Sequence, residues 1–186
     1  VFRRLIRALK IYNIPVILPY LSHQLGRVSL RALSKELDSQ ICNKCGLYKK
    51  INLLGFSMGG IVSRIWLQEL GGAYRTESFL SVGSPHFGTF TAQLIPSWLL
   101  LGLSEMKVGS HLLEDLNRDF GLLELVDCSS FFCKWDLMVV PGAKAALPIG
   151  AKYQLPTLTH KGMIYNRKSV DILIKMILSV SGQYAL

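Results

Sequence analysis

Residues 51–70 read INLLGFSMGGIVSRIWLQEL, and this stretch decides the fold. It opens with a short apolar run at residues 51–54, turns through residues 55–60, and continues with apolar residues at helical spacing. Gly71 and Gly72 follow at the place where a helix commonly ends. The stretch therefore predicts a strand, a tight turn and a helix, with Ser57 at the turn.

A strand-to-helix turn this tight is expected to be strained. We expect Gly55 and Gly59 to omit side chains that would clash across it, so that Ser57 projects at the C-terminal edge of a sheet. The free N–H groups at the N-terminus of the following helix point toward the same place, and the Met58 N–H is a candidate donor to an oxyanion. The pattern Gly-x-Ser-x-Gly alone has little specificity, because a glycine-rich turn with a buried serine also produces it.

The composition is that of one folded domain. The chain has 186 residues, of which 50% are apolar and 18% charged, and these values argue against disorder. The net charge of +9 is compatible with anionic membrane surfaces or nucleic acid. However, the basic residues are scattered in pairs and no nucleic-acid motif is present, so we expect solvated basic side chains and no nucleic-acid partner.

The four cysteines leave two special roles open, a zinc site or two disulfides. Cys42 and Cys45 form a C-x-x-C pair, whereas Cys128 and Cys133 lie far away at a spacing that is loose for zinc. Ordinary thiols are the simpler interpretation, so we expect neither a metal nor a cofactor. The apolar run at residues 94–103 is too short for a membrane span and contains Pro96, so the compartment stays open between cytoplasm and a membrane periphery.

The rest of the chain alternates between helical and strand patterns. We expect helices over residues 1–12, 29–41, 58–70, 105–120 with an interruption near Gly109, and 166–177, and strands over 14–20, 51–54, 77–82, 129–135 and 152–155. This alternation predicts an α/β fold, a three-layer α/β/α sandwich around a mostly parallel sheet, in a single domain of residues 1–186. Residues 91–120 are a possible insertion forming a lid or pocket, and the apolar part of it fits core packing equally well.

A serine nucleophile needs a base, and the base needs an acid to orient it. The candidate bases are His23, His86, His111 and His160. His160 follows the last predicted strand and Asp136 follows the strand before it, so both fall at the sheet edge that Ser57 occupies. Glu124 and Asp127 are rival acids placed before or within that strand. A helix-capping histidine and a turn aspartate are the alternatives for His160 and Asp136.

Four segments in this order together resemble the lipase and esterase branch of the α/β-hydrolase family. They are GFSMGG at residues 55–60, GSPHFGT at 83–89, DLMVVP at 136–141, and His160 before the last helix. The resemblance implies acyl transfer from an ester to water, with Ser57 as nucleophile, His160 as base and Asp136 orienting His160. It also implies a substrate pocket that includes Phe56, His86, Phe87, Leu94 and Trp98, in which His86 is either structural or pocket-lining.

One departure from the family concerns the oxyanion hole. Members supply a second N–H donor from a loop after an earlier strand, usually marked by His-Gly, and this chain contains no such dipeptide. In the family sheet that strand lies between the predicted strands at residues 14–20 and 51–54. The resemblance therefore implies an α/β-hydrolase fold that is incomplete at its N-terminal side.

Two hypotheses from different classes follow. The first is a serine hydrolase that cleaves carboxylic esters, with an ester or lipid as substrate, peripheral membrane contact and an acyl-enzyme on Ser57. The second is a catalytically weak or inactive hydrolase-fold module used for binding or membrane association, which the missing oxyanion loop and the +9 charge favour. Thioesters and amides would use the same Ser57, His160 and Asp136, so the leaving group stays open.

Overall fold

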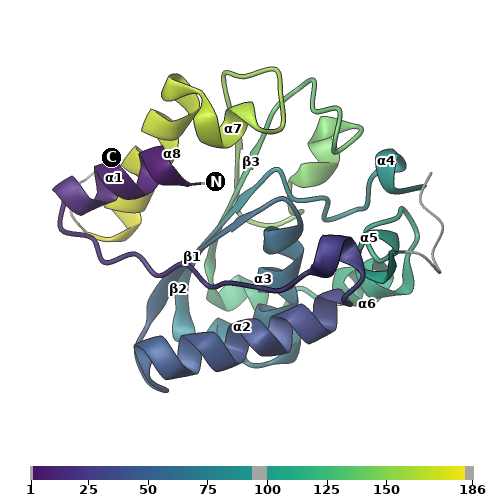
Figure 1. Cartoon of the computed structure of the whole chain (residues 1–186), viewed down its shortest axis with the longest axis horizontal. Coiled ribbons are helices and arrows are strands. Elements are labelled where there is room, and N and C mark those ends of the chain that lie inside the picture. Colours follow the sequence, from purple (N-terminus) through teal and green to yellow (C-terminus); the bar gives the residue numbers. More distant parts are fainter. Residues whose placement is uncertain (1, 94–99, 183–186) are drawn as a thin grey trace.

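One parallel sheet organises the molecule. The structure is a computed structural model that describes residues 2–93 and 100–182. The four strands of the sheet are β1 (Ile51–Phe56), β2 (Thr76–Val82), β3 (Asp127–Phe132) and β4 (Ala151–Gln154). They lie in sequential order and every neighbouring pair is parallel (Figure 1). Because parallel neighbours need a crossover, each connection must carry the chain back over the sheet.

Eight α-helices lie in the first two crossovers and on the flanks of the sheet, whereas the described connection from β3 to β4 contains only the 3-10 turn Gly142–Ala145. They are α1 (Arg3–Ile11), α2 (Leu30–Cys45), α3 (Met58–Glu69), α4 (Phe90–Gln93), α5 (Leu101–Ser104), α6 (His111–Arg118), α7 (Gly162–Tyr165) and α8 (Arg167–Val180) within the described part of the chain. Three of them begin with a side-chain N-cap: the side chains of Ser29, Ser110 and Asn166 accept hydrogen bonds from the first turns of α2, α6 and α8.

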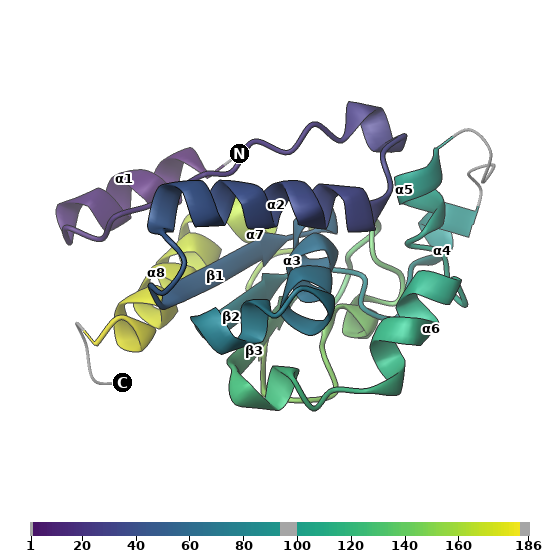
Figure 2. The same ribbon diagram turned by 90° about the horizontal axis from the view of Figure 1, so that it is seen from below.

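The helices form layers on both faces of the sheet. One buried cluster joins α2, α3 and α6, and the other joins α1, α7 and α8 (Figures 1 and 2). The sheet contributes side chains to both clusters because successive side chains of a strand point to opposite faces of the sheet. Phe79 of β2 belongs to the first cluster and Leu80 to the second. The predicted three-layer α/β/α sandwich with a parallel sheet is confirmed.

The predicted buried strand at residues 14–20 is wrong. This segment pairs with no strand among the described residues, and most of its apolar side chains are exposed, including Val16, Ile17 and Leu18. Its contacts lead instead to α2, where the Gln40 amide bonds to both the N–H and the C=O of Tyr20. A β-type sequence becomes a strand only where a neighbouring backbone lies within hydrogen-bonding distance, and the sheet described here ends at β1.

The predicted insertion at residues 91–120 contains both surface and core structure. The helix expected over residues 105–120, with an interruption near Gly109, forms only in its second half: α5 ends at Ser104 and α6 begins at His111, with Gly109 at a φ of +75° between them. Helix α6 buries Leu113 and Leu116 against α3, so this end of the segment is part of the core. Whether the segment acts as a lid stays a prediction, since residues 94–99 lie outside the described part.

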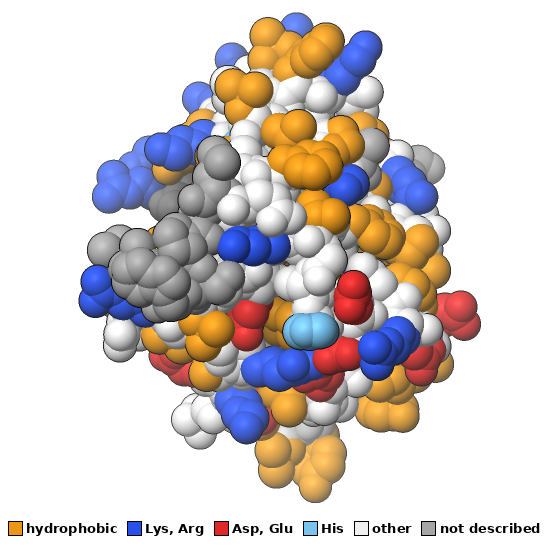
Figure 3. All heavy atoms as spheres, turned by 90° about the vertical axis from the view of Figure 1, so that its right-hand side faces the viewer, with side chains coloured by type: hydrophobic (Ala, Val, Ile, Leu, Met, Phe, Trp, Pro, Cys, Tyr) orange, Lys and Arg blue, Asp and Glu red, His pale blue; other side chains and the backbone are white. Residues whose placement is uncertain are grey.

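Charges are mixed on the surface that Figure 3 shows. Lys and Arg side chains are spread there among acidic and apolar ones, without forming one continuous basic patch (Figure 3). Among the described helices, none combines the length and the apolar character that crossing a bilayer requires.

Burial predicts which leucines stabilise the fold. Leu173 of α8 is fully buried against the sheet, whereas Leu158 is 69% exposed in the loop after β4. Leu173→Ala is expected to lower the free energy of unfolding by about 2–5 kcal/mol because it leaves a cavity. The matched variant Leu158→Ala should change it by less than about 0.5 kcal/mol. Urea unfolding followed by circular dichroism measures both, and equal losses would contradict this packing.

Candidate active site

Ser57 lies in a strained turn at the C-terminal end of β1. Its backbone has φ 55° and ψ −126°, a conformation that a residue with a side chain rarely adopts. Two backbone hydrogen bonds hold the turn: the Ser57 N–H donates to Val82 O of β2 at 2.9 Å, and the Gly60 N–H donates to Ser57 O at 3.0 Å. The half-buried Ser57 is thereby fixed at the sheet edge, at the N-cap of α3.

Two glycines of the turn are required by packing, but not the pair expected. A Cβ on Gly55 would lie 2.5 Å from Gly60 Cα, so the predicted need for glycine at position 55 is confirmed. A Cβ on Gly59 would meet no atom of the described residues within 4 Å, so the clash expected there is wrong in this structure. The crowded position is Gly60, where a Cβ would overlap the side chain of Ser84.

Asp136 and His160 form a buried hydrogen-bonded pair. His160 Nδ1 lies 2.8 Å from Asp136 Oδ2, and the two residues are 8% and 3% exposed. The other carboxylate oxygen, Oδ1, accepts hydrogen bonds from the N–H groups of Met138 and Val139. Because an ionised carboxylate only accepts, the pairing favours a proton on Nδ1 and leaves Nε2 with a lone pair. Nε2 is buried and no hydrogen-bond partner is described for it.

The ring of His160 lies over the ends of β1 and β2. Its centroid is 4.8 Å from that of Phe56, the residue before Ser57, at an interplanar angle of 34°. A Cβ at Gly83, the residue after β2, would come within 3.1 Å of His160 Cε1, so a glycine at this position leaves room for the ring. The structure therefore brings Ser57, Asp136 and His160 to one edge of the sheet.

The rival residues lie elsewhere. His23 is exposed beside the short 3-10 turn Gln24–Gly26, and His111 is exposed at the first residue of α6. Asp127 is the first residue of β3 and Glu124 precedes it, so both belong to the opposite edge of the parallel sheet.

Thr89 supports the loop that carries Asp136, a role that the sequence reasoning missed. The Thr89 hydroxyl donates to Met138 O at 2.8 Å and accepts from the Val140 N–H at 3.2 Å. Thr91 donates to the same carbonyl oxygen at 2.8 Å. These bonds tie the loop after β2 to the loop after β3. In the sequence, Thr89 is visible only as the last residue of GSPHFGT. A threonine in a loop does not reveal a hydrogen-bond partner about 50 residues away.

The predicted pocket residues have different positions. Phe56 and Phe87 are half-buried, and Leu94 and Trp98 lie outside the described residues. His86 is fully buried with its Nε2 2.7 Å from Ser81 Oγ. Burial lowers the pKa of His86 well below 6.5, and the nearby Arg64 guanidinium lowers it further. Of the two roles expected for His86, full burial favours the structural one.

The described residues contain no cluster of three or more His, Cys, Asp or Glu side chains that could hold a metal ion. Burial raises the pKa of the Cys133 thiol to about 11, and the Asp136 carboxylate adds to the effect. The thiol therefore stays protonated and unreactive at neutral pH. The arrangement combines the hydroxyl of Ser57, the imidazole of His160, whose Nε2 has no described partner, and the carboxylate of Asp136.

A parallel sheet with helices on both faces and these loops at its C-terminal edge is the α/β-hydrolase fold, and solved structures share it. The mature form of the Bacillus licheniformis lipase BlEst2 superposes with a TM-score of 0.64 at 15% identity, covering 82% of this chain and 74% of that one. Aspergillus fumigatus lipase B gives a TM-score of 0.66 at 18% identity, covering 78% and 41%. The Legionella pneumophila phospholipase PlaB gives 0.63 at 13% identity, covering 98% and 59%.

At sequence identities of 13–18%, the similarity to these solved structures establishes the fold and no more. The chain spans less than two thirds of the lengths of lipase B and PlaB. No protein-family model matches the chain, and no curated protein matches it in sequence.

The buried neutral His86 predicts a pH dependence of stability. Below pH 6.5 the unfolded chain binds a proton at His86 that the folded chain excludes, so stability is complete above that pH and is lost as the pH falls. The expected slope is up to about 1.4 kcal/mol per pH unit. Urea unfolding between pH 7.5 and 5 should show a shallower dependence in His86→Gln. The control His111→Gln, on an exposed side chain, should keep the original slope; identical slopes in the two variants would contradict the assignment.

Proposed function

We propose that the protein is a serine hydrolase that cleaves carboxylic esters through Ser57, His160 and Asp136 by way of an acyl-enzyme. The observation that carries the proposal is the buried Asp136–His160 hydrogen bond at the C-terminal edge of the sheet, which also holds the strained Ser57. The described residues offer no partner to Nε2 of His160. Strain of this kind is retained where surrounding structure over-determines it, commonly at functional sites. The shared fold of lipases and esterases supports the same reading.

In the proposed mechanism, His160 Nε2 takes the proton of Ser57 as Oγ attacks the ester carbonyl carbon. Asp136 holds the imidazole in position and stabilises the imidazolium that forms. The C–O bond to the alcohol then breaks, and His160 returns the proton to the departing oxygen. Water then gives a proton to the same nitrogen as its oxygen attacks the acyl carbon. The bond from that carbon to Ser57 Oγ breaks, and His160 returns the proton to Oγ as the acid leaves. Each proton thus moves between the reacting oxygens and His160 alone.

The negative oxygen of the tetrahedral intermediate needs hydrogen-bond donors. Met58 is the first residue of α3, so its N–H belongs to the turn of a helix whose N–H groups have no intrahelical acceptor. We assign it as one oxyanion donor. A second donor is expected from a loop of the His-Gly type, which this sequence does not contain, and loss of one donor lowers the rate by roughly a hundred- to a thousandfold.

The substrate class is proposed from the surface around the site. Large apolar side chains are exposed in the segments that follow β2, β3 and β4; they are Phe90 of α4, Leu101 of α5, Trp135, Leu137, Met138 and Leu158. Exposed apolar side chains in the segments after the strands favour contact with acyl chains or a lipid surface. We therefore propose an ester with an apolar acyl group, and peripheral membrane contact through these segments. The printed names of the similar structures, lipases and a phospholipase, agree with this class.

The competing function is a hydrolase-fold module that binds without turnover, which the lack of a His-Gly dipeptide in this sequence favours. Labelling with a serine-reactive fluorophosphonate separates the two. In the folded protein we expect Ser57 to be labelled, and Ser57→Ala to abolish labelling and lower ester hydrolysis by about a millionfold. A folded protein that resists labelling would select the binding module.

The orienting role of Asp136 is tested separately. Asp136→Asn keeps the shape of the side chain but donates a hydrogen bond where the carboxylate accepts one, so it favours the wrong tautomer of His160. We expect kcat to fall by about ten-thousandfold with KM little changed. Asp127→Asn, at the opposite edge of the sheet, is the matched control and should retain activity; similar losses in both variants would remove Asp136 from the mechanism.

A further inference from the structure

The segments that follow β2, β3 and β4 are joined to one another at the C-terminal edge of the sheet. The Thr91 hydroxyl donates to Met138 O at 2.8 Å, which connects the segment after β2 to the loop after β3. His160 Nδ1 lies 2.8 Å from Asp136 Oδ2, which connects that loop to the segment after β4. The three joined segments are called the loop face here; they are residues 89–91, 134–144 and 158–161.

The exposed charges of the loop face are positive. Its basic side chains are Lys134 and Lys161, which are exposed, and Lys144, which is half-buried. Its one acidic residue, Asp136, is only 3% exposed. The segment at the other end of β3, residues 119–127, has the opposite character, with exposed acidic side chains and no basic one. The loop face therefore presents positive charge, which favours an anionic partner.

Large apolar side chains lie between these lysines. Trp135 and Leu137 are 63% and 80% exposed. The Nζ atom of Lys134 lies 5.5 Å from the centroid of the Trp135 ring. The Nζ atom of Lys144 lies 4.9 Å from the centroid of the Phe90 ring. Such cation–π contacts hold an ammonium group beside an apolar side chain. This combination suits a boundary between headgroups and acyl chains, where charge stays in the polar layer and apolar groups enter the lipid.

We propose that the loop face binds a bilayer surface that contains anionic lipids. The lysines lie at the level of the lipid phosphates, and the exposed apolar side chains enter the layer of acyl chains below. A nucleic acid would match the charge but would leave Leu137 and Leu158 without an apolar partner. Binding to the surface does not require turnover, whereas cleavage of an anionic lipid ester drawn from that surface rests on the proposed function.

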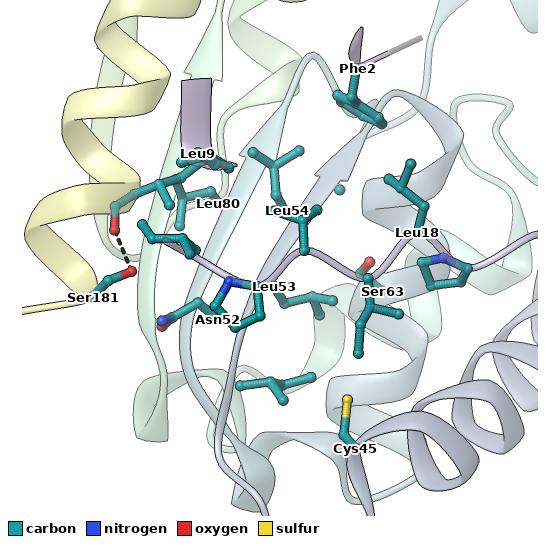
Figure 4. Close-up of a pocket in the computed structure, with 18 of the residues that line it drawn as sticks. Phe2, Leu9, Leu18, Cys45, Asn52, Leu53, Leu54, Ser63, Leu80 and Ser181 are labelled. Carbon is teal, nitrogen blue, oxygen red and sulfur yellow. Dashed lines mark hydrogen bonds between the residues drawn. The ribbon is translucent and has the colours of Figure 1, made fainter. Parts of the chain in front are cut away.

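A separate apolar groove is the rival site for a lipid. It has a volume of about 980 Å³ and lies along β1, where Leu18, Leu53 and Leu54 are among the residues that line it (Figure 4). No residue of the loop face lines this groove, whereas Lys49 and Lys50 do. These two lysines are exposed and precede β1, at the opposite edge of the sheet. Their substitution therefore removes the same charge from the rival site and gives a matched control.

Co-sedimentation with lipid vesicles tests the proposal, in protein carrying Ser57→Ala so that no lipid is consumed. Vesicles that mix phosphatidylglycerol with phosphatidylcholine should bind at least about tenfold more tightly than phosphatidylcholine alone, and salt at about 0.5 M should remove most of this difference. The variant K134Q/K161Q should bind the mixed vesicles about 25-fold more weakly, because each lysine near an anionic surface contributes about fivefold. The control K49Q/K50Q should bind as tightly as the parent protein.

The apolar part of the loop face is tested by Leu137→Ala. This variant should weaken binding to the mixed vesicles by roughly three- to tenfold, because less apolar surface enters the lipid, and it should keep the salt dependence. Unchanged binding in this variant would overturn the proposal.

Three further results would also overturn the proposal. They are equal binding to neutral and mixed vesicles, equal losses in the two lysine pairs, and displacement from the vesicles by soluble glycerol phosphate. Tighter binding to double-stranded DNA than to the mixed vesicles would replace the lipid surface with a nucleic acid. None of these measurements reads hydrolysis, so a protein that binds the vesicles but resists labelling at Ser57 would refute the proposed function alone.

Discussion

The hydrogen bond from the Ser57 N–H to Val82 O is the constraint on which the site depends. It joins the end of β1 to the end of β2 while the backbone of Ser57 stays in a conformation that side chains disfavour. The parallel register of the two strands places Phe56 opposite Val82, and only glycines at positions 55 and 60 let the chain turn directly into α3. The pairing of two strands thus determines where one hydroxyl lies.

The Asp136–His160 pair depends on the same sheet through longer connections. Each residue follows a different strand, and the order of β3 and β4 brings their loops together. Thr89 adds a link from the loop after β2, so three strand ends contribute to one hydrogen-bonded arrangement. Burial of the pair removes competing water, which strengthens its hydrogen bond, and it leaves His160 Nε2 buried without a partner among the described residues.

The sequence predicted features that depend on residues a few positions apart, and it failed to predict features that depend on contact with a distant part of the chain. The apolar spacing of α8 and the caps at Ser29, Ser110 and Asn166 were predictable because each depends on residues within a few positions. Residues 14–20 have strand composition, yet they remain unpaired because pairing needs a second backbone. The error over Gly59 has the same origin, since crowding is a property of neighbours in space.

The sequence by itself determined the alternation of helices and strands, the turn at Ser57 and the order in which Ser57, Asp136 and His160 occur, because these follow from side-chain periodicity and backbone preference. Only the tertiary structure decided that Asp136 and His160 meet at 2.8 Å, that His86 is buried rather than accessible, and that Thr89 holds the Asp136 loop. Those contacts join residues distant in sequence, and strand order and helix packing alone set the distances between them.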